Sequence, residues 1–346
     1  REYRYVPASH TARLFARFER DAAPLDAAGT ANCYIAPQTY SRYSFDATTM
    51  GNGRTTPDIK PAKLAGTEAR ILWETGSERG AVIRAVEYDK GRIYFETGHK
   101  SGNALIGLFD AAGTCVWSWH IWSPNSDPTR YTMTSSTGAV FMDRNLGALN
   151  NTPMDVGNRG MFYEWGRKDP FTPSRSPYHA DTDGNNVPAY NEPNTAIGDG
   201  TGTWVYNAQA AVLATPPANI PNSILNPMTY LQSPYNGHAD WYCTGTDPKA
   251  THPGLWGPEK TIFDPCPPGW RVPPPEAWTL EQTTVSSTIE GGCYLYTGSV
   301  WPYYPYAGLL HVMPTGKEMY VGVGIRTQLW TNAPGSPASD PSRVDA

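Results

Sequence analysis

The chain has 346 residues and a formal net charge of −5, from 27 Lys and Arg against 32 Asp and Glu. No cluster of basic residues supplies the positive surface that a phosphate backbone requires, so nucleic acid is excluded as an expected partner. The 33 glycines, the 33 prolines and an aromatic share of 12% argue against a helical bundle. They favour a β-rich fold with many turns and long ordered loops.

The length of the chain predicts two domains, each large enough to bury its own core. No apolar run approaches the ~20 residues of a membrane-spanning helix. The sequence begins at Arg1 without a signal-like apolar segment, and we interpret it as a mature or trimmed form. Its five cysteines contain no C-x-x-C pair, which argues against a zinc ribbon and fits an oxidising compartment with one or two disulfides.

Two β-hairpins are predicted in the first half of the chain. Alternating apolar residues at 82–88 and 92–95 flank the turn Asp89-Lys90-Gly91, which indicates the first hairpin. Similar runs at 104–109 and 114–122 flank a second Gly-containing turn and indicate the other.

These strands predict an antiparallel β-sandwich over roughly residues 30–125. Trp117, Trp119 and Ile121 alternate along the last strand and therefore share one face of it. The polar, turn-forming segment 123–128 follows, and we place the end of an N-terminal domain close to it, at residues 1–135.

The second half of the chain, residues 136–332, is predicted to be an irregular domain dense in Pro, Gly and aromatic residues. A strand at 139–142 fits either domain. One short helix is expected after three prolines, beginning at Glu276-Ala277-Trp278. Residues 333–346 contain mainly Pro, Ser, Ala and Asp without an apolar pattern, and we expect a flexible tail there.

Four motifs in the second half occur in a fixed order. They are M-D-R-N-L-G-A at 142–148, G-M-F-Y-E-W-G-R-K-D-P-F at 160–171, T-I-F-D-P-C-P-P-G-W-R-V-P at 261–273 and Y-P-Y-A-G at 304–308. Together they resemble the FISUMP-type (major paralogous domain) family. The first half is similar to the β domain that precedes this module in such proteins, through A-N-C-Y-I at 31–35 and W-S-W-H-I-W at 117–122.

The resemblance implies a fold similar to C-type-lectin-like domains and to the formylglycine-generating group of enzymes, with little regular structure. The whole chain is thus expected to be mainly β with an α+β second domain. The resemblance also implies an extracellular location on a bacterial surface, on lipoproteins or on fimbrial tip and accessory subunits. The expected partners are other pilus or surface-assembly subunits, together with a glycan or a host surface protein.

No catalytic motif accompanies this resemblance. The sequence lacks G-x-S-x-G, H-E-x-x-H, a P-loop and a Gly-rich dinucleotide turn. We therefore expect a non-catalytic adhesin or pilus tip or accessory subunit rather than an enzyme. Two alternatives stay open, a carbohydrate-binding surface lipoprotein for nutrient capture and a structural filament subunit assembled by strand exchange.

Calcium is the cofactor that the sequence suggests. Asp181, Asp183, Asn185 and Glu192 offer oxygen ligands at loop positions 1, 3, 5 and 12, the spacing that wraps a hard cation. Position 6 is Asn186 where a calcium loop has glycine. A surface loop ordered by Asx turns is the alternative.

Four aromatic residues are candidates for a ligand platform: Trp301, Tyr303, Tyr304 and Tyr306. Aromatic rings stack on the apolar faces of sugars, so these side chains could bind a glycan. The alternative is that they pack the core of a Pro-rich loop region.

Charged residues inside the family motifs, Arg144, Glu164, Arg167, Lys168, Asp169 and Arg271, are expected to form ion pairs and hydrogen bonds that pin loops. Disulfides are predicted between Cys33 and Cys115 and between Cys243 and Cys266. This pairing leaves Cys293 free or matched to a residue outside the chain.

Overall fold

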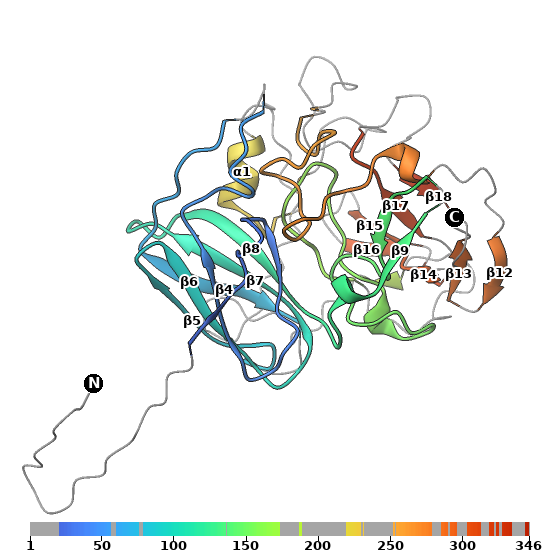
Figure 1. The fold of residues 1–346 in the computed structure, drawn as a ribbon, viewed down its shortest axis with the longest axis horizontal. Coiled ribbons are helices and arrows are strands. Elements are labelled where there is room, and N and C mark those ends of the chain that lie inside the picture. Colours follow the sequence, from blue (N-terminus) through green and yellow to red (C-terminus); the bar gives the residue numbers. More distant parts are fainter. Residues whose placement is uncertain are drawn as a thin grey trace, which may run out of the picture.

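Strands provide most of the regular structure of this protein, and helices are few and short, so the fold is mainly β as predicted. The computed structural model describes residues 21–56, 60–75, 79–135, 137–173, 187–188, 219–229, 231, 252, 254–278, 285–289, 291–295, 303–312, 318–321, 323–324, 327–333 and 343–345. Figure 1 shows the blue and teal strands of the first half on one side and the orange and red strands of the last third on the other.

Two four-stranded sheets make up the first half. One has the order β1-β3-β6-β5 and the other the order β2-β8-β7-β4. Their strands are β1 (Ala23–Pro24), β2 (Cys33–Ile35), β3 (Arg42–Asp46), β4 (Glu68–Glu74), β5 (Ile83–Asp89), β6 (Arg92–Thr97), β7 (Gly102–Phe109) and β8 (Cys115–Ser123). Both predicted hairpins are confirmed, because β5 pairs antiparallel with β6 and β7 pairs antiparallel with β8.

The prediction of a purely antiparallel arrangement is wrong at one edge of each sheet. Strand β1 runs parallel to β3, and β2 runs parallel to β8. A parallel pair needs a long connection, and the chain between β2 and β8 contains five other strands. Local turn patterns do not reveal such a pairing, because the two partners lie far apart in the sequence.

The two sheets pack face to face through aromatic side chains. Tyr34 on β2 stacks on Phe45 of β3 with ring centroids 4.6 Å apart, and Phe45 contacts Trp119 on β8 at 5.3 Å. Trp117, Trp119 and Ile121 all belong to this core, as their alternation predicted. The intervening residues Ser118, His120 and Trp122 are therefore directed to the opposite face of β8.

Short elements and loops form the part of the chain that follows β8, which is called the second half from here on. Its strands are β9 (Thr132–Thr134), β10 (Val140–Met142), β11 (Val187–Pro188), β12 (Val285–Ile289), β13 (Gly292–Leu295), β14 (Tyr303–Pro305), β15 (Leu309–Val312), β16 (Glu318–Val321), β17 (Gln328–Trp330) and β18 (Arg343–Asp345). Its helical turns are η1 (Pro128–Arg130), η2 (Val156–Asn158), α1 (Asn219–Leu225) and η4 (Pro275–Trp278). The short helix expected near Glu276 is present as the 3-10 turn η4.

Two features of the second half differ from the predicted domain limits. The hairpin of β9 and β10 spans the boundary placed at residue 135. At the other end, β18 pairs antiparallel with β17, so part of the segment predicted as a flexible tail belongs to a small sheet.

One apolar core runs through both halves of the chain. Tyr34, Phe45 and Trp119 of the two sheets belong to the same buried cluster as Trp256 and Phe263 of the later loops. The rings of Trp117 and Phe263 lie 6.0 Å apart where the two halves meet. This contact region between the sheets and the later loops is called the join. The loops of the second half are thus packed directly onto the sheets. Within the part of the chain that the structure describes, no helix has the length and apolar character to cross a bilayer.

Candidate functional site

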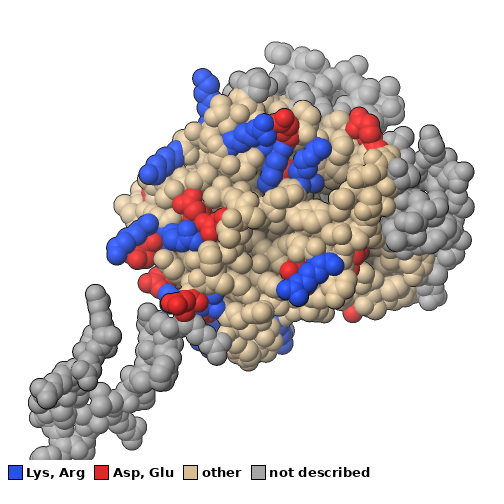
Figure 2. Space-filling view, in the orientation of Figure 1, with Lys and Arg blue, Asp and Glu red and all other residues tan. Residues whose placement is uncertain are grey.

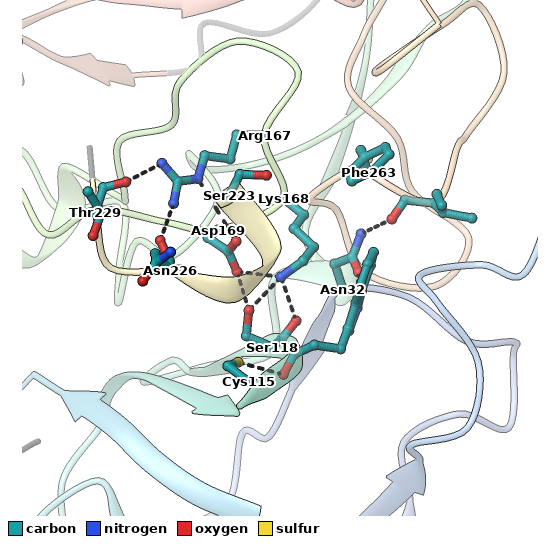
Figure 3. A network of polar contacts seen from close by, with 12 residues as sticks. Asn32, Cys115, Ser118, Arg167, Lys168, Asp169, Ser223, Asn226, Thr229 and Phe263 are labelled. Carbon is teal, nitrogen blue, oxygen red and sulfur yellow. Dashed lines mark hydrogen bonds and ion pairs between the residues drawn. The ribbon is translucent and has the colours of Figure 1, made fainter. Parts of the chain in front are cut away.

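The outer face of β8 carries a buried polar cluster where the second half packs on the sheet. The Ser118 hydroxyl donates to Asp169 Oδ1 at 2.6 Å. Lys168 Nζ donates to the same carboxylate oxygen at 2.7 Å and to the Ser118 carbonyl at 3.2 Å. Figure 3 shows Lys168 and Asp169 converging on Ser118. Side chains from the R-K-D part of the second motif therefore meet the strand directly.

A serine beside a lysine is an arrangement that can create a nucleophile, because a neutral amine can accept the hydroxyl proton. Burial lowers the pKa of Lys168, and the Asp169 carboxylate opposes that shift. Here the Ser118 hydroxyl donates to a carboxylate, and the lysine is in an ion pair with that same carboxylate. Lys168 and Asp169 are only 2% and 1% exposed. A substrate has no direct approach to these groups, so the cluster acts as a structural join.

Arg167 organises the loop that follows α1. Its guanidinium donates to the carboxylate of Glu164, to the Thr229 carbonyl and to the Asn226 carbonyl, the last at 2.9 Å. The other Glu164 oxygen accepts the backbone N–H of Leu231 at 2.9 Å. Arg167 also lies over the Phe171 ring, 5.1 Å from its centroid. This pair satisfies backbone groups that no sheet or helix satisfies.

Asp264 performs the same task in the third motif. One carboxylate oxygen accepts the Cys266 N–H at 2.8 Å and Lys260 Nζ at 2.6 Å, and the other accepts the Val272 N–H at 3.0 Å. Asp264 is 1% exposed. The buried carboxylate therefore fixes both ends of the C-P-P-G-W-R-V turn.

The turn around Asp264 is fastened to the first half by Asn32. Its Nδ2 donates to the carbonyls of Ile262 at 2.6 Å and Asp264 at 2.9 Å, while its Oδ1 accepts from the Trp117 indole at 3.0 Å. The backbone of Gly51, at a positive φ of 49°, lies so close to Ile262 that an added Cβ would be 2.3 Å from the Ile262 carbonyl oxygen. A glycine is required at this close approach.

His120 lies at the centre of a second buried polar group. Its Nε2 is 2.9 Å from Asn103 Oδ1, and its Nδ1 is 3.2 Å from the Tyr163 hydroxyl. Asn103 uses its amide N–H to donate to the Gly147 carbonyl, so its oxygen acts as acceptor. This assigns the proton to Nε2 of His120 and makes the Tyr163 hydroxyl a donor to Nδ1.

Burial lowers the pKa of His120 to about 3 and raises the pKa of Tyr163 well above its ordinary value. Both groups are therefore neutral at physiological pH. His120 is 1% exposed. The Tyr163 hydroxyl and the Asn103 amide oxygen thus satisfy both ring nitrogens of the buried His120.

The remaining motif residues support the predicted pinning role. Arg144 donates to both oxygens of Asp143 and to the carbonyl of Leu149. Arg271 donates to the carbonyl of Pro258 at 2.6 Å. Together with Glu164, Arg167, Lys168 and Asp169, these contacts confirm the expectation that the charged residues form ion pairs and hold loops.

The candidate aromatic platform is largely internal. Tyr303, Tyr304 and Tyr306 are 7%, 6% and 8% exposed, and Tyr304 and Tyr306 pack in a small cluster with Cys293. This placement favours the core packing that the sequence left open over an exposed stacking surface. Trp301, the fourth member, lies outside the described residues.

The predicted calcium loop, with ligands Asp181, Asp183, Asn185 and Glu192, lies outside the described residues and stays a prediction. Within the described ranges, no group of three or more His, Cys, Asp or Glu side chains is arranged to hold a metal ion.

The predicted disulfide between Cys33 and Cys115 is wrong. Both thiols are free, as are those of Cys266 and Cys293. Cys33 is paired with His120 along the β2–β8 ladder, five positions from Cys115. Five residues of a strand span roughly 16 Å, well beyond the ~7 Å limit between the Cα atoms of a disulfide. Cys243, the predicted partner of Cys266, lies outside the described residues.

Sequence reasoning did not select Asn32, Asn103, Ser118, His120 or Tyr163. The signal that could have found two of them is the W-S-W-H-I-W alternation of β8, in which Ser118 and His120 occupy the face opposite Trp117 and Trp119. Two polar residues at alternate positions of an almost entirely buried strand indicate a polar contact on that face. Their partners come from distant segments and carry no local signal.

The charged surface shows no single-sign patch in the view of Figure 2. Lys and Arg side chains lie beside Asp and Glu side chains, and broad areas between them carry neither. The exposed ion pairs among the described residues include Arg84 with Glu96 at 2.7 Å.

A comparison of this chain with known proteins found no matching family model, no matching curated protein and no matching solved structure.

Proposed function

We propose that this chain is a non-catalytic, extracellular binding protein of a bacterial surface, an adhesin or a tip or accessory subunit of a pilus. In this proposal the two packed sheets are a β-sandwich that serves as stalk or assembly module. Residues 136–332 are a C-type-lectin-like module that presents loops to a glycan or a host surface protein.

The observation that carries the proposal is that the charged motif residues are buried and bonded to other parts of the chain. Three of these side chains are at most 2% exposed: Arg167, Lys168 and Asp264. Each of them binds backbone groups or an oppositely charged side chain. Side chains with this arrangement rigidify loops without offering a reactive group to a substrate. A rigid set of loops suits recognition, because little conformational freedom is lost when a ligand binds.

Ligand contact in this proposal is assigned to Trp301 and its neighbouring loops rather than to all four aromatic residues. The low exposure of Tyr303, Tyr304 and Tyr306 gives these three rings a supporting role. Calcium, if bound at 181–192, would order one of the loops of the module.

The test is binding of the purified full chain to a glycan array and to immobilised host surface proteins, with calcium and with a chelator. Saturable binding is expected, and Trp301→Ala should weaken it by roughly tenfold or more, as stacking residues at binding sites do. Tyr304→Phe is the matched control, because it keeps a buried ring and should leave affinity unchanged.

Other results would select the alternatives. Preference for a digestible polysaccharide favours nutrient capture, and reversible multimers in size-exclusion chromatography favour a strand-exchange filament. Turnover of any bound ligand into a released product would contradict the non-catalytic assignment. Absence of binding on both surfaces would contradict the adhesin proposal itself.

A further inference from the structure

The turn between β2 and β3 holds a tyrosine in an unusual backbone conformation. Tyr40 has a φ of 50°, in the left-handed region. A bulky side chain is rare there because its Cβ is crowded by the backbone, and Gly or Asn adopts this conformation at lower cost. Lys90, which also has a positive φ, belongs to the hairpin turn before Gly91, where the twist of the strands requires it. Tyr40 lies in no hairpin, because β2 and β3 belong to different sheets.

The ring of Tyr40 contributes little to the core. The residue is 62% exposed, and no other large hydrophobic residue in the described part of the first half is exposed. Burial is the ordinary way in which an aromatic ring stabilises a fold, and most of this residue faces solvent. Stability therefore explains neither the residue type nor its conformation at this position. A strained residue without a structural reason indicates a role on the solvent side of the turn.

The backbone beneath this ring is fixed by the end of β6. The Tyr40 N–H donates to the Gly98 carbonyl at 3.0 Å, and the Ser41 N–H donates to the Thr97 hydroxyl at 2.9 Å. The same hydroxyl donates to the Gln38 carbonyl at 2.7 Å, and Thr97 is 1% exposed. These bonds keep the strained conformation in place. The ring therefore has a rigid support, and little conformational freedom is lost when it contacts a ligand.

The neighbourhood of the ring favours a sugar over a protein as the ligand. A protein interface needs a contiguous apolar patch, and Tyr40 is the one exposed large hydrophobic residue of the described first half. A sugar needs one aromatic face for its C–H groups, together with hydroxyl or amide groups for its own hydroxyls. Gln38 and Thr39, the two residues before Tyr40, are exposed and carry such groups. Residues 36–41 include no charged side chain, so a neutral sugar fits this turn better than an ionic ligand.

We propose that Tyr40 is a contact residue for a carbohydrate ligand. Its ring stacks on the apolar face of a pyranose, and Gln38 and Thr39 bind hydroxyls of the same sugar. The inference rests on the proposed binding function and extends it, because it gives the first half a ligand contact of its own in addition to a role as stalk or assembly module.

The test compares Tyr40→Gly and Tyr40→Phe with the wild-type full chain on an array of pyranose oligosaccharides, followed by calorimetry with the glycan that binds most tightly. Glycine removes the ring and adopts a φ of 50° without strain. Affinity should fall by roughly tenfold or more in Tyr40→Gly, as it does for central contact residues. Tyr40→Phe keeps the ring and should retain affinity within about threefold.

The thermal midpoint separates a contact role from a structural one. Relief of the backbone strain should leave the midpoint of Tyr40→Gly unchanged or raise it by up to about 3 °C. Met154→Gly is the matched control, because Met154 also has a positive φ and is 36% exposed. It should change the thermal midpoint in the same direction and leave glycan affinity unchanged.

A second readout uses wild-type protein alone, so it does not depend on the folding of any variant. Hydroxyl radicals oxidise exposed tyrosine rings, and the oxidised residues are located by peptide mass spectrometry. Oxidation of Tyr40 should fall when the protein is saturated with the glycan selected on the array.

Four results would overturn the proposal. They are unchanged glycan affinity in Tyr40→Gly, an equal loss of affinity in Met154→Gly, a thermal midpoint of Tyr40→Gly more than about 3 °C below wild type, and equal oxidation of Tyr40 with and without glycan. Each of them leaves the proposed function standing, because the wild-type chain still binds a glycan. A wild-type chain that binds no glycan would also contradict the role of Tyr40, whereas its binding to a host protein would still support the adhesin proposal.

Discussion

The two halves of this protein satisfy their buried backbone by different means. In the first half, two four-stranded sheets pair N–H and C=O groups in continuous ladders. In the second half, strands are short, and single side chains such as Arg167, Asp264 and Asn32 bind the loop backbone instead. The first half also uses this device at Glu74, whose carboxylate accepts the N–H groups of Val82 and Ile83.

This difference indicates which side chains contribute most to the free energy of unfolding. A ladder distributes its hydrogen bonds over many residues, so the loss of one surface side chain leaves the backbone pairing intact. A buried side chain that holds several backbone groups cannot be removed without leaving each of them unsatisfied. Substitutions at the joins should therefore cost far more than substitutions on the exposed sheet surface.

The largest effect is expected from Lys168→Met. The substitution removes the nearer of the two cations beside the Asp169 carboxylate, which is 1% exposed, and leaves only the Arg167 Nε at 3.9 Å. We expect a loss of about 3–5 kcal/mol in the free energy of unfolding, measured by denaturant titration.

The control for this prediction is the double variant Lys168→Met with Asp169→Leu, which removes both charges. It should recover a large part of the stability, because no unpaired charge remains. A single variant that costs less than about 1 kcal/mol would show that the ion pair is not the main support of this join.

Asn32→Ala should have the next largest effect. It removes three hydrogen bonds and leaves the Ile262 carbonyl, the Asp264 carbonyl and the Trp117 indole unsatisfied. A loss of roughly 2–4 kcal/mol is expected in the same titration. Asn151→Ala is the matched control, because exposed Asn151 makes one bond, to Asp143, and should cost under about 1 kcal/mol. Equal losses for both variants would contradict the proposed importance of the join.

Protonation of His120 should contribute to the pH dependence of the free energy of unfolding. Because burial lowers its folded pKa to about 3 from an unfolded value near 6.5, the unfolded chain binds the proton first as pH falls. The contribution of neutral His120 is complete above about pH 6.5 and is lost as pH falls toward 3, by at most about 1.4 kcal/mol per pH unit.

This prediction is checked by urea titrations between pH 7 and pH 4 on wild-type protein and on His120→Gln. The variant should show a shallower decline over that range, since it has no group to protonate at this position. Parallel curves for the two proteins would assign the pH dependence to other groups.

The smallest effect is expected on the exposed sheet surface. Arg84→Ala removes the cross-strand pair with Glu96, in which the arginine side chain is 61% exposed. The free energy of unfolding should change by less than about 1 kcal/mol, and added salt should reduce the difference between the two proteins. A loss as large as that of Asn32→Ala would contradict the expectation that substitutions at the join cost more than substitutions on the sheet surface.

Local sequence patterns predicted the parts of the fold that depend on near neighbours. Apolar alternation around Asp89-Lys90-Gly91 and around the turn at 110–113 identified both hairpins, and three prolines identified η4. The helix α1 carries Pro221 inside a short segment without clear helical periodicity, and it was not predicted.

The features missed are those fixed by distant partners. The parallel pairing of β2 with β8 and the contact of Asn32 with Ile262 join residues far apart in the sequence. The tyrosines near residue 304 illustrate a second limit, because composition alone does not distinguish an aromatic surface from an aromatic core. The roles of the charged motif residues were predicted, but their partners were not.

The hydrogen bonds that join Asn32 to the turn around Asp264 have a consequence for the order of folding. A chain made from its N-terminus has all strands of both sheets before residue 124, but the buried Asn32 side chain beside the edge strand β2 lacks its two carbonyl acceptors until residue 264 is added. During that interval the edge strand has unpaired backbone groups, which are a template for aggregation. Contacts between residues so far apart in the sequence also form slowly. A truncated chain that ends before residue 260 should consequently retain its hairpins yet associate with other copies of itself.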